Sequence, residues 1–201
     1  MLFSHSLCLC PRLSLRLVAA LAVALMVGSG LVRAAPQNTV APPVFTQQTL
    51  PDAVFIGQGQ MRFLGLRIYD ARLWSQPQFD AKNFDAYPLV LELAYHRAFT
   101  GQAIAQRSIH EIQRQCELSP AQAQRWLQAL TALLPDVQAG DRLTGLYQPG
   151  LGLRLWRGQH ALGTINDAEL ARRFFGIWLS PRTSEPSLRS ALLAGKIGMA
   201  P

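Results

Sequence analysis

Residues 142–165, RLTGLYQPGLGLRLWRGQHALGTI, decide the fold class. Short apolar runs at 142–147, 151–156 and 161–165 are separated by residues typical of tight turns, among them Pro149, Gly150 and Gly158. Such short connections can join only antiparallel neighbours, because a parallel crossover needs a dozen or more residues. The stretch therefore predicts an antiparallel meander of three strands.

Upstream of the meander, the sequence predicts further strands and a pair of helices. Residues 61–74, MRFLGLRIYDARLW, are predicted to form one long strand with a bend or bulge at Gly65. Residues 89–97 alternate in the manner of a half-buried strand. Residues 100–117 have isoleucines at helical spacing behind a threonine N-cap, and Ser119, followed by proline, opens a second helix.

Downstream of the meander, two more helices are predicted. Asn166, with Glu169 three residues later, resembles a capping box at a helix start. Ser184-Glu185-Pro186 opens a last short helix that Gly195 is expected to end. An order of strands, helices, meander and helices predicts an α+β fold, with helices layered on a curved antiparallel sheet, and not a βαβ repeat.

The first 34 residues have the layout of an export signal. Arg12 and Arg16 precede an uncharged apolar run at residues 17–27, and small residues favour cleavage after Ala34. An uncleaved anchor is the alternative, although the run is short for a membrane span. We therefore predict a signal peptide at 1–34, a flexible N-terminal segment at 35–50 that ends in a short edge strand, and one domain at 51–201.

Cleavage would leave 201 − 34 = 167 residues, enough to bury one hydrophobic core. A content of 49% hydrophobic and 15% charged residues is globular. The mature charge would be (19 − 3) − 12 = +4, with the arginines scattered, so no nucleic-acid partner is expected. The protein is predicted to be periplasmic or secreted, without a stable membrane span after signal removal, and the sequence identifies no protein partner.

The mature sequence carries no motif for a metal, a cofactor or hydrolase chemistry. Gly57-Gln58-Gly59 lacks the third glycine of a dinucleotide fingerprint, and these glycines are expected to allow a bulge or a close approach. Cys116 has no nucleophile signature, and the histidines lie on separate predicted elements. The carboxylates are predicted to be ion-pair partners of Arg67, Arg97 or Arg107; they are Asp70, Glu92 and Glu111.

Several stretches, taken in order, carry a family resemblance. They are Gly57-x-Gly59 leading into GLRIYDARLW, TGQAIAQRSIHEI, LLPDVQAGDRL, LGTI before a capped helix, and FFGIWLSP followed by SLRSALLAG. Together they resemble bacterial chalcone isomerase-like proteins over residues 45–195. The resemblance implies an open-faced β-sandwich, in which a layer of helices covers a curved antiparallel sheet and a cleft lies between the helices and the sheet. Plant relatives cyclise chalcones or bind fatty acids in that cleft.

The resemblance also implies that the isomerase residues have been replaced. The arginine of the plant enzymes falls at Met61, and Arg62 is displaced by one residue, which points it to the opposite face of a strand. The other plant residues, a threonine, a tyrosine, an asparagine and a second threonine, fall at Ile68, Ile104, Glu111 and near Ile177. None of the five is kept, so no catalytic residue is assigned.

Aliphatic side chains at these positions predict a cleft for an apolar ligand such as a fatty acid, with Arg62 or Arg67 meeting its carboxylate. Three alternatives stay open. The isoleucines fill a closed core and the protein is a scaffold; the protein is an enzyme, either a residual isomerase or one that uses Tyr95, Arg97 and Glu111; or the N-terminal segment or a sheet edge recruits a partner. A guanidinium that converges with two or more hydroxyl or amide groups on an open hollow would contradict the loss of catalysis.

Overall fold

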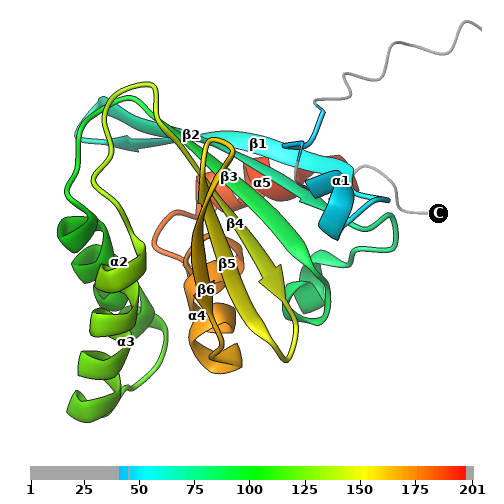
Figure 1. Cartoon of the computed structure of the whole chain (residues 1–201). Helices are drawn as coiled ribbons and strands as arrows, with labels where there is room; N and C mark the ends of the chain where they lie inside the picture. The colour runs from blue at the N-terminus through cyan, green and yellow to red at the C-terminus, as the bar shows by residue number, and fades with distance from the viewer. Residues whose placement is uncertain (1–40, 45, 198–201) are drawn as a thin grey trace, which may run out of the picture. The chain divides into compact units, whose positions relative to one another are not determined.

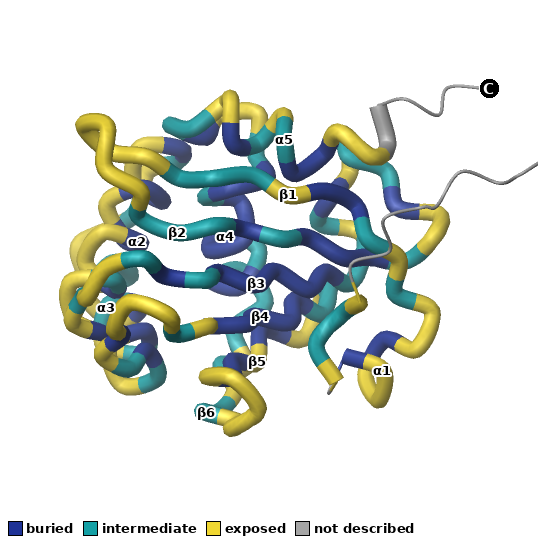
Figure 2. Tube along the Cα trace, turned by 90° about the horizontal axis from the view of Figure 1, so that it is seen from above, coloured by how far each residue is buried: buried dark blue, intermediate teal, exposed yellow. Residues whose placement is uncertain are grey.

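The sheet has six antiparallel strands in the described part of the chain, each beside its sequence neighbour (Figure 1). The computed structural model describes residues 41–44 and 46–197. The strands are β1 (Val54–Phe63), β2 (Leu66–Ser75), β3 (Leu89–Tyr95), β4 (Arg142–Gln148), β5 (Gly152–Arg157) and β6 (His160–Ile165). Central strands β3 and β4 are buried along most of their length (Figure 2). The α+β class and the meander predicted for residues 142–165 are confirmed.

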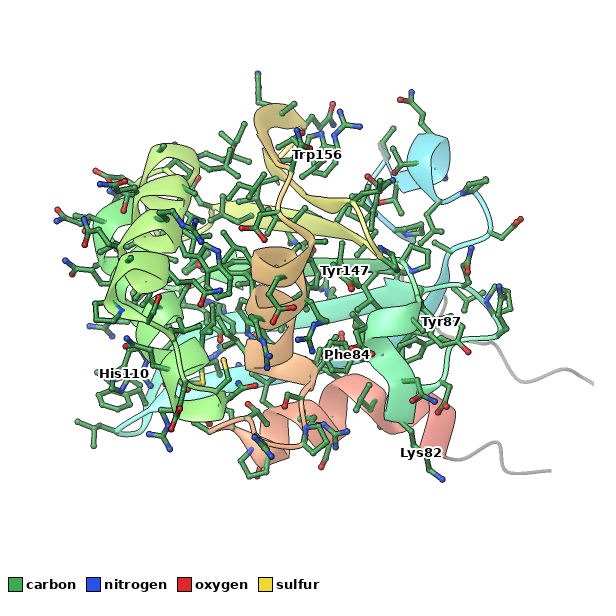
Figure 3. All side chains as sticks on the ribbon, turned by 90° about the horizontal axis from the view of Figure 1, so that it is seen from below. Lys82, Phe84, Tyr87, His110, Tyr147 and Trp156 are labelled. Carbon is green, nitrogen blue, oxygen red and sulfur yellow. The ribbon has the colours of Figure 1, made fainter. Side chains whose placement is uncertain are left out.

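Helices cover one face of the sheet (Figure 1). α4 (Ala168–Leu179) packs on β4 and β5, α5 (Pro186–Ile197) runs along β1, and α2 (Gly101–Gln115) contacts both α4 and α3 (Pro120–Leu133). Phe84, from the short 3-10 helix η1 (Ala81–Ala86), and Tyr147 lie in the layer between sheet and helices (Figure 3). None of the helices in the described residues is long and apolar enough to cross a membrane.

β1 and β2 are separate strands joined by a tight turn at Leu64 and Gly65. Both residues have positive φ, 48° and 79° respectively. The chain therefore reverses fully and Met61 pairs with Tyr69 across the hairpin, so the single bent strand predicted for residues 61–74 is wrong. A turn with two central residues of positive φ usually carries Asn or Gly at the first of them. Because Leu64 occupies this position, the sequence does not predict the turn.

The glycines of β1 and α5 let the helix lie directly on the strand. A Cβ atom at Gly57 would lie 2.5 Å from the carbonyl oxygen of Leu192, and one at Gly195 would overlap the carbonyl oxygen of Ile56. The β1–β2 pairing also shifts register just before Gly57, so the bulge and close approach predicted there are confirmed. The prediction that Gly195 ends the last helix is wrong, because α5 runs past this glycine.

A second apolar cluster covers the opposite face of the sheet, where Leu50 packs with Trp74 and other strand residues. α1 (Thr46–Thr49) is one helical turn, closed by the Leu50 N–H donating to the Thr46 carbonyl at 2.6 Å. The short edge strand predicted here is therefore wrong, since burial of Leu50 sets the local conformation. The predicted domain boundaries stay predictions.

Side-chain caps mark the helix starts. Thr100 and Ser119 each accept a hydrogen bond from the backbone N–H three residues later, at 3.1 and 3.2 Å, which confirms the predicted starts of α2 and α3. α4 is capped by Asp167, one residue after the predicted Asn166, and Glu169 pairs with the following arginines instead of closing a capping box.

Candidate functional site

A cavity of about 380 Å³ lies between the inner face of the sheet, α2 and α4. Its wall is mostly apolar and takes side chains from five of the strands, from both helices, and from the segment between α4 and α5. Exposed residues in the wall mark the opening; they are Phe63, Ala103 and Arg107. The opening therefore lies where the β1–β2 hairpin meets α2.

Five of the residues predicted to bind a ligand lie in the wall of this cavity. Met61 comes from β1, Ile68 from β2, Ile104 and Glu111 from α2, and Ile177 from α4. Positions far apart in the sequence are thus brought to one place. Their part in ligand binding stays a prediction.

The two arginines predicted to meet a carboxylate lie outside the cavity wall. Arg62 Nη1 donates to the carbonyl oxygen of Gly65 in the exposed hairpin turn, at 3.3 Å. Arg67 Nη2 lies 3.4 Å from Asp70 Oδ2, an oxygen that is also 2.8 Å from His96 Nε2. Both side chains lie outside the cavity wall, so the carboxylate of a ligand in the cavity would have to pair with a different cation.

Aromatic side chains in the cavity wall pack against one another. On α4, the Phe174 ring lies edge-on to Phe175 and Trp178, with ring centroids 6.1 and 5.4 Å apart. On the sheet, the Tyr69 and Tyr95 rings are 5.7 Å apart at an angle of 65°. Edge-to-face pairs of this kind contribute about 0.5–1.5 kcal/mol beyond the burial of their surface, which favours the observed ring orientations.

Arg107, Glu111 and Ser184 form a polar cluster in the cavity wall. Arg107 Nη2 lies 2.6 Å from Glu111 Oε1, and the Ser184 hydroxyl donates to Glu111 Oε2 at 2.7 Å. The Glu111 side chain is only 5% exposed, whereas Arg107 is 56% exposed. The spacing of four residues between Arg107 and Glu111 on one helix signals such a pair in the sequence. Ser184 follows α4 in the chain and is far from Glu111 in the sequence, so no local pattern predicts their hydrogen bond.

The ion pairs predicted for two of the carboxylates are confirmed. Asp70 pairs with Arg67, and Glu111 pairs with Arg107. Glu92 was expected to pair with one of Arg67, Arg97 and Arg107 and instead lies 3.6 Å from Arg72 and 2.6 Å from Arg142. These arginines lie on the strands flanking β3, and cross-strand neighbours, which cannot be read from local spacing, decide this pair.

The Tyr69 hydroxyl links the sheet to α4 at the edge of the cavity. It accepts a hydrogen bond from Trp178 Nε1 at 3.0 Å. Burial raises the pKa of Tyr69 to about 12, and the Trp178 hydrogen bond only partly offsets that rise. Burial likewise raises the pKa of Tyr95. Both phenols therefore keep their protons at neutral pH and can donate hydrogen bonds.

One end of the cavity carries polar groups beside the aliphatic residues predicted from the sequence. A guanidinium, from Arg107, and the hydroxyls of Tyr69 and Ser184 all lie in the wall. The guanidinium is already paired with Glu111, however, and the Ser184 hydroxyl donates to the same carboxylate. Among the described residues, no three or more His, Cys, Asp or Glu side chains come together as a possible metal site.

Comparisons with known proteins agree with this architecture. A sequence model of the family described as chalcone isomerase-like matches residues 75–194. An uncharacterized protein of Haemophilus influenzae is 28% identical over 138 residues, which are 69% of this chain and 66% of that protein. The crystal structure of a fatty-acid binding protein of Arabidopsis thaliana aligns with a TM-score of 0.56 at 13% identity, covering 71% of this chain and 87% of that one. At this identity, the structural match establishes a shared fold.

Proposed function

The chain belongs to the chalcone isomerase-like family, and from that premise we propose that it binds one small apolar molecule and does not transform it. The cavity of about 380 Å³ is the observation that carries the proposal. Ligand pockets are typically ~300–1,000 Å³ with mainly apolar walls, whereas closed cores leave few voids larger than a water molecule. The open cavity therefore favours ligand binding over the scaffold alternative.

An acyl chain suits the apolar part of the site. Removing apolar surface from water contributes roughly 25 cal/mol per Å², and the wall formed by Met61, Ile68, Ile104 and Ile177 offers few polar groups to a chain. The shared fold with a fatty-acid binding protein supports the same choice of ligand.

The charges in the wall favour an uncharged polar head group over a carboxylate. Arg107 contributes +1, and Glu111 and Glu185 contribute −2 together, so the formal sum is −1. A ligand carboxylate would have to compete with Glu111 for the Arg107 guanidinium, which it already contacts at 2.6 Å. A hydroxyl or amide head group can instead donate to Glu111 and accept from Tyr69 without adding charge.

A Glu111→Gln variant tests where the head group lies. Removing the negative charge leaves Arg107 free to pair with a ligand carboxylate. We expect the affinity for laurate, relative to that for dodecanol, to rise roughly fivefold, or ~1 kcal/mol for a half-exposed arginine. Displacement of a fluorescent apolar probe measures both ligands on the same delipidated protein.

Glu117→Gln is the matched control, because Glu117 is exposed just beyond α2 and is not part of the cavity wall. It removes the same charge, and the laurate-to-dodecanol ratio should stay at its wild-type value. An unchanged ratio in Glu111→Gln, or an equal change in both variants, would place the head group elsewhere.

Export is the second part of the proposal. Its support is the order of residues 1–34, in which two arginines precede an uncharged apolar run and small residues. In that account the mature protein begins at Ala35 and works in the periplasm or outside the cell. The mass of the protein recovered from a periplasmic extract tests this, and a chain that keeps residues 1–34 would contradict it.

An enzyme of the chalcone isomerase type is the second candidate, because Arg107 and the hydroxyls of Tyr69 and Ser184 share one cavity. A cation and hydroxyls near an enone would stabilise its developing oxyanion. We expect no turnover in a direct spectrophotometric chalcone assay, because Arg107 is held by Glu111. Chalcone cyclisation that is lost in Arg107→Gln would establish the enzyme and refute the binding role.

A further inference from the structure

The turn between β1 and β2 exposes an apolar tip, which we define as Phe63, Leu64, Gly65 and Leu66 (Figure 2). Phe63 is 54% exposed, Leu64 86% and Leu66 49%. Single exposed apolar residues are common on soluble proteins, but three within one short turn form a patch of the kind that marks an interaction site.

The backbone at the tip is strained at Leu64, whose side chain is also the most exposed of the tip. Leu64 has a φ of 48°, a left-handed conformation that is unfavourable for a branched side chain. Asn, Asp or Gly would suit this turn position better. The leucine gains almost no burial within the chain in return. A partner that buries the Leu64 side chain would offset this strain.

The tip lies at the mouth of the cavity. Phe63 belongs both to the tip and to the cavity wall, and Met61 on the same strand lies in the wall as well. Arg107, on the facing side of the opening, is also exposed. Whatever covers the tip therefore also faces the opening through which an apolar molecule would enter.

The charges beside the tip indicate a negatively charged partner. Residues 57–70 contain Arg62, Arg67 and Asp70, a net charge of +1. Arg67 pairs with Asp70 at 3.4 Å, so Arg62 supplies the positive charge beside the tip. The Arg62 guanidinium is exposed and makes its hydrogen bond to the Gly65 carbonyl at the base of the turn. Apolar side chains beside the Arg62 guanidinium match a bilayer with anionic lipids, since the side chains enter the acyl region while the guanidinium stays among the phosphates.

We propose that the tip docks on the surface of a membrane containing anionic phospholipids, so that the cavity opens toward the bilayer. Docking of this kind would let an apolar molecule pass between membrane and cavity without crossing water. The tip can dock whether or not the cavity is filled, so a failure of docking and a failure of ligand binding are observed separately.

Co-sedimentation of the full chain with vesicles tests the proposal. Vesicles of phosphatidylglycerol and phosphatidylcholine should bind the wild-type protein more tightly than vesicles of phosphatidylcholine alone. Leu64→Asn places a residue preferred by this turn, so the fold should be kept while binding to the mixed vesicles falls at least roughly tenfold. Arg62→Gln should lower binding to the anionic vesicles roughly fivefold and leave the neutral ones unaffected.

Leu151→Asn is the matched control. Leu151 is 64% exposed in the β4–β5 turn, and the antiparallel order places this turn at the opposite end of the sheet from the tip (Figure 1). Its substitution should leave vesicle binding unchanged. The proposal is overturned if the wild-type protein does not bind, if both leucine variants lose binding equally, or if Leu64→Asn abolishes a dimer instead of vesicle binding.

Discussion

An Ile104→Trp variant is expected to fold and to bind its ligand with at least roughly tenfold lower affinity than the wild-type protein, a change of ~1.4 kcal/mol in binding free energy, and therefore to be recovered with less bound ligand. Ile104 is half-buried on α2 and lies in the cavity wall. An indole at this position extends into existing empty space of about 380 Å³, so it displaces a ligand without overpacking the core. Mass spectrometry of organic extracts measures the ligand, and a thermal melt checks the fold.

Gln106→Trp is the control for this experiment. Gln106 lies on the same helix two residues further along, is exposed, and is outside the cavity wall. The same indole there should leave ligand content at the wild-type level. Equal ligand content in the two variants would mean that the bound molecule occupies some other site.

A Gly57→Val variant should lose about 3 kcal/mol of unfolding free energy, near the upper end of the usual cost of overpacking. The Cβ atom would lie 2.5 Å from the Leu192 carbonyl oxygen and 2.6 Å from that of Ala191, both of which are backbone atoms of α5. Since neither can rotate away, the helix has to shift off β1. Urea unfolding measures the loss, and a melting temperature lower by roughly 10 °C should accompany it.

Gln58→Val introduces the same side chain one residue later in β1, where the strand is exposed. Its effect should stay within about 0.5 kcal/mol, as for most surface substitutions. Wild-type stability in Gly57→Val would show that α5 does not rest directly on this strand.

Local patterns were sufficient to predict much of the fold. The meander at residues 142–165 was predictable because each strand ends at turn residues and pairs with its chain neighbour. The caps at Thr100 and Ser119 act within one helical turn, so they too can be read locally. At Gly65 the sequence predicts only a bend, because Leu64 occupies a turn position where Asn or Gly is usual.

Contacts between distant segments account for what local patterns could not show. In the sequence Gly195 is typical of a helix end. In the structure it lies within α5, where the backbone of β1 leaves no room for a Cβ atom. In the candidate site, the family resemblance selected Met61, Ile68, Ile104 and Ile177, which the fold brings to one cavity. The hydrogen bond from Ser184 to Glu111 depends on the path of the chain between α4 and α5, and no short sequence pattern predicts it.

Native mass spectrometry of the wild-type protein, purified from a bacterium without detergent, distinguishes a ligand-binding protein from a scaffold. We expect a main species that exceeds the mass of the chain by one small apolar molecule, which organic extraction then removes. A folded protein that shows only the mass of its chain, and that binds neither dodecanol nor laurate afterwards, would contradict the binding role and support the scaffold role.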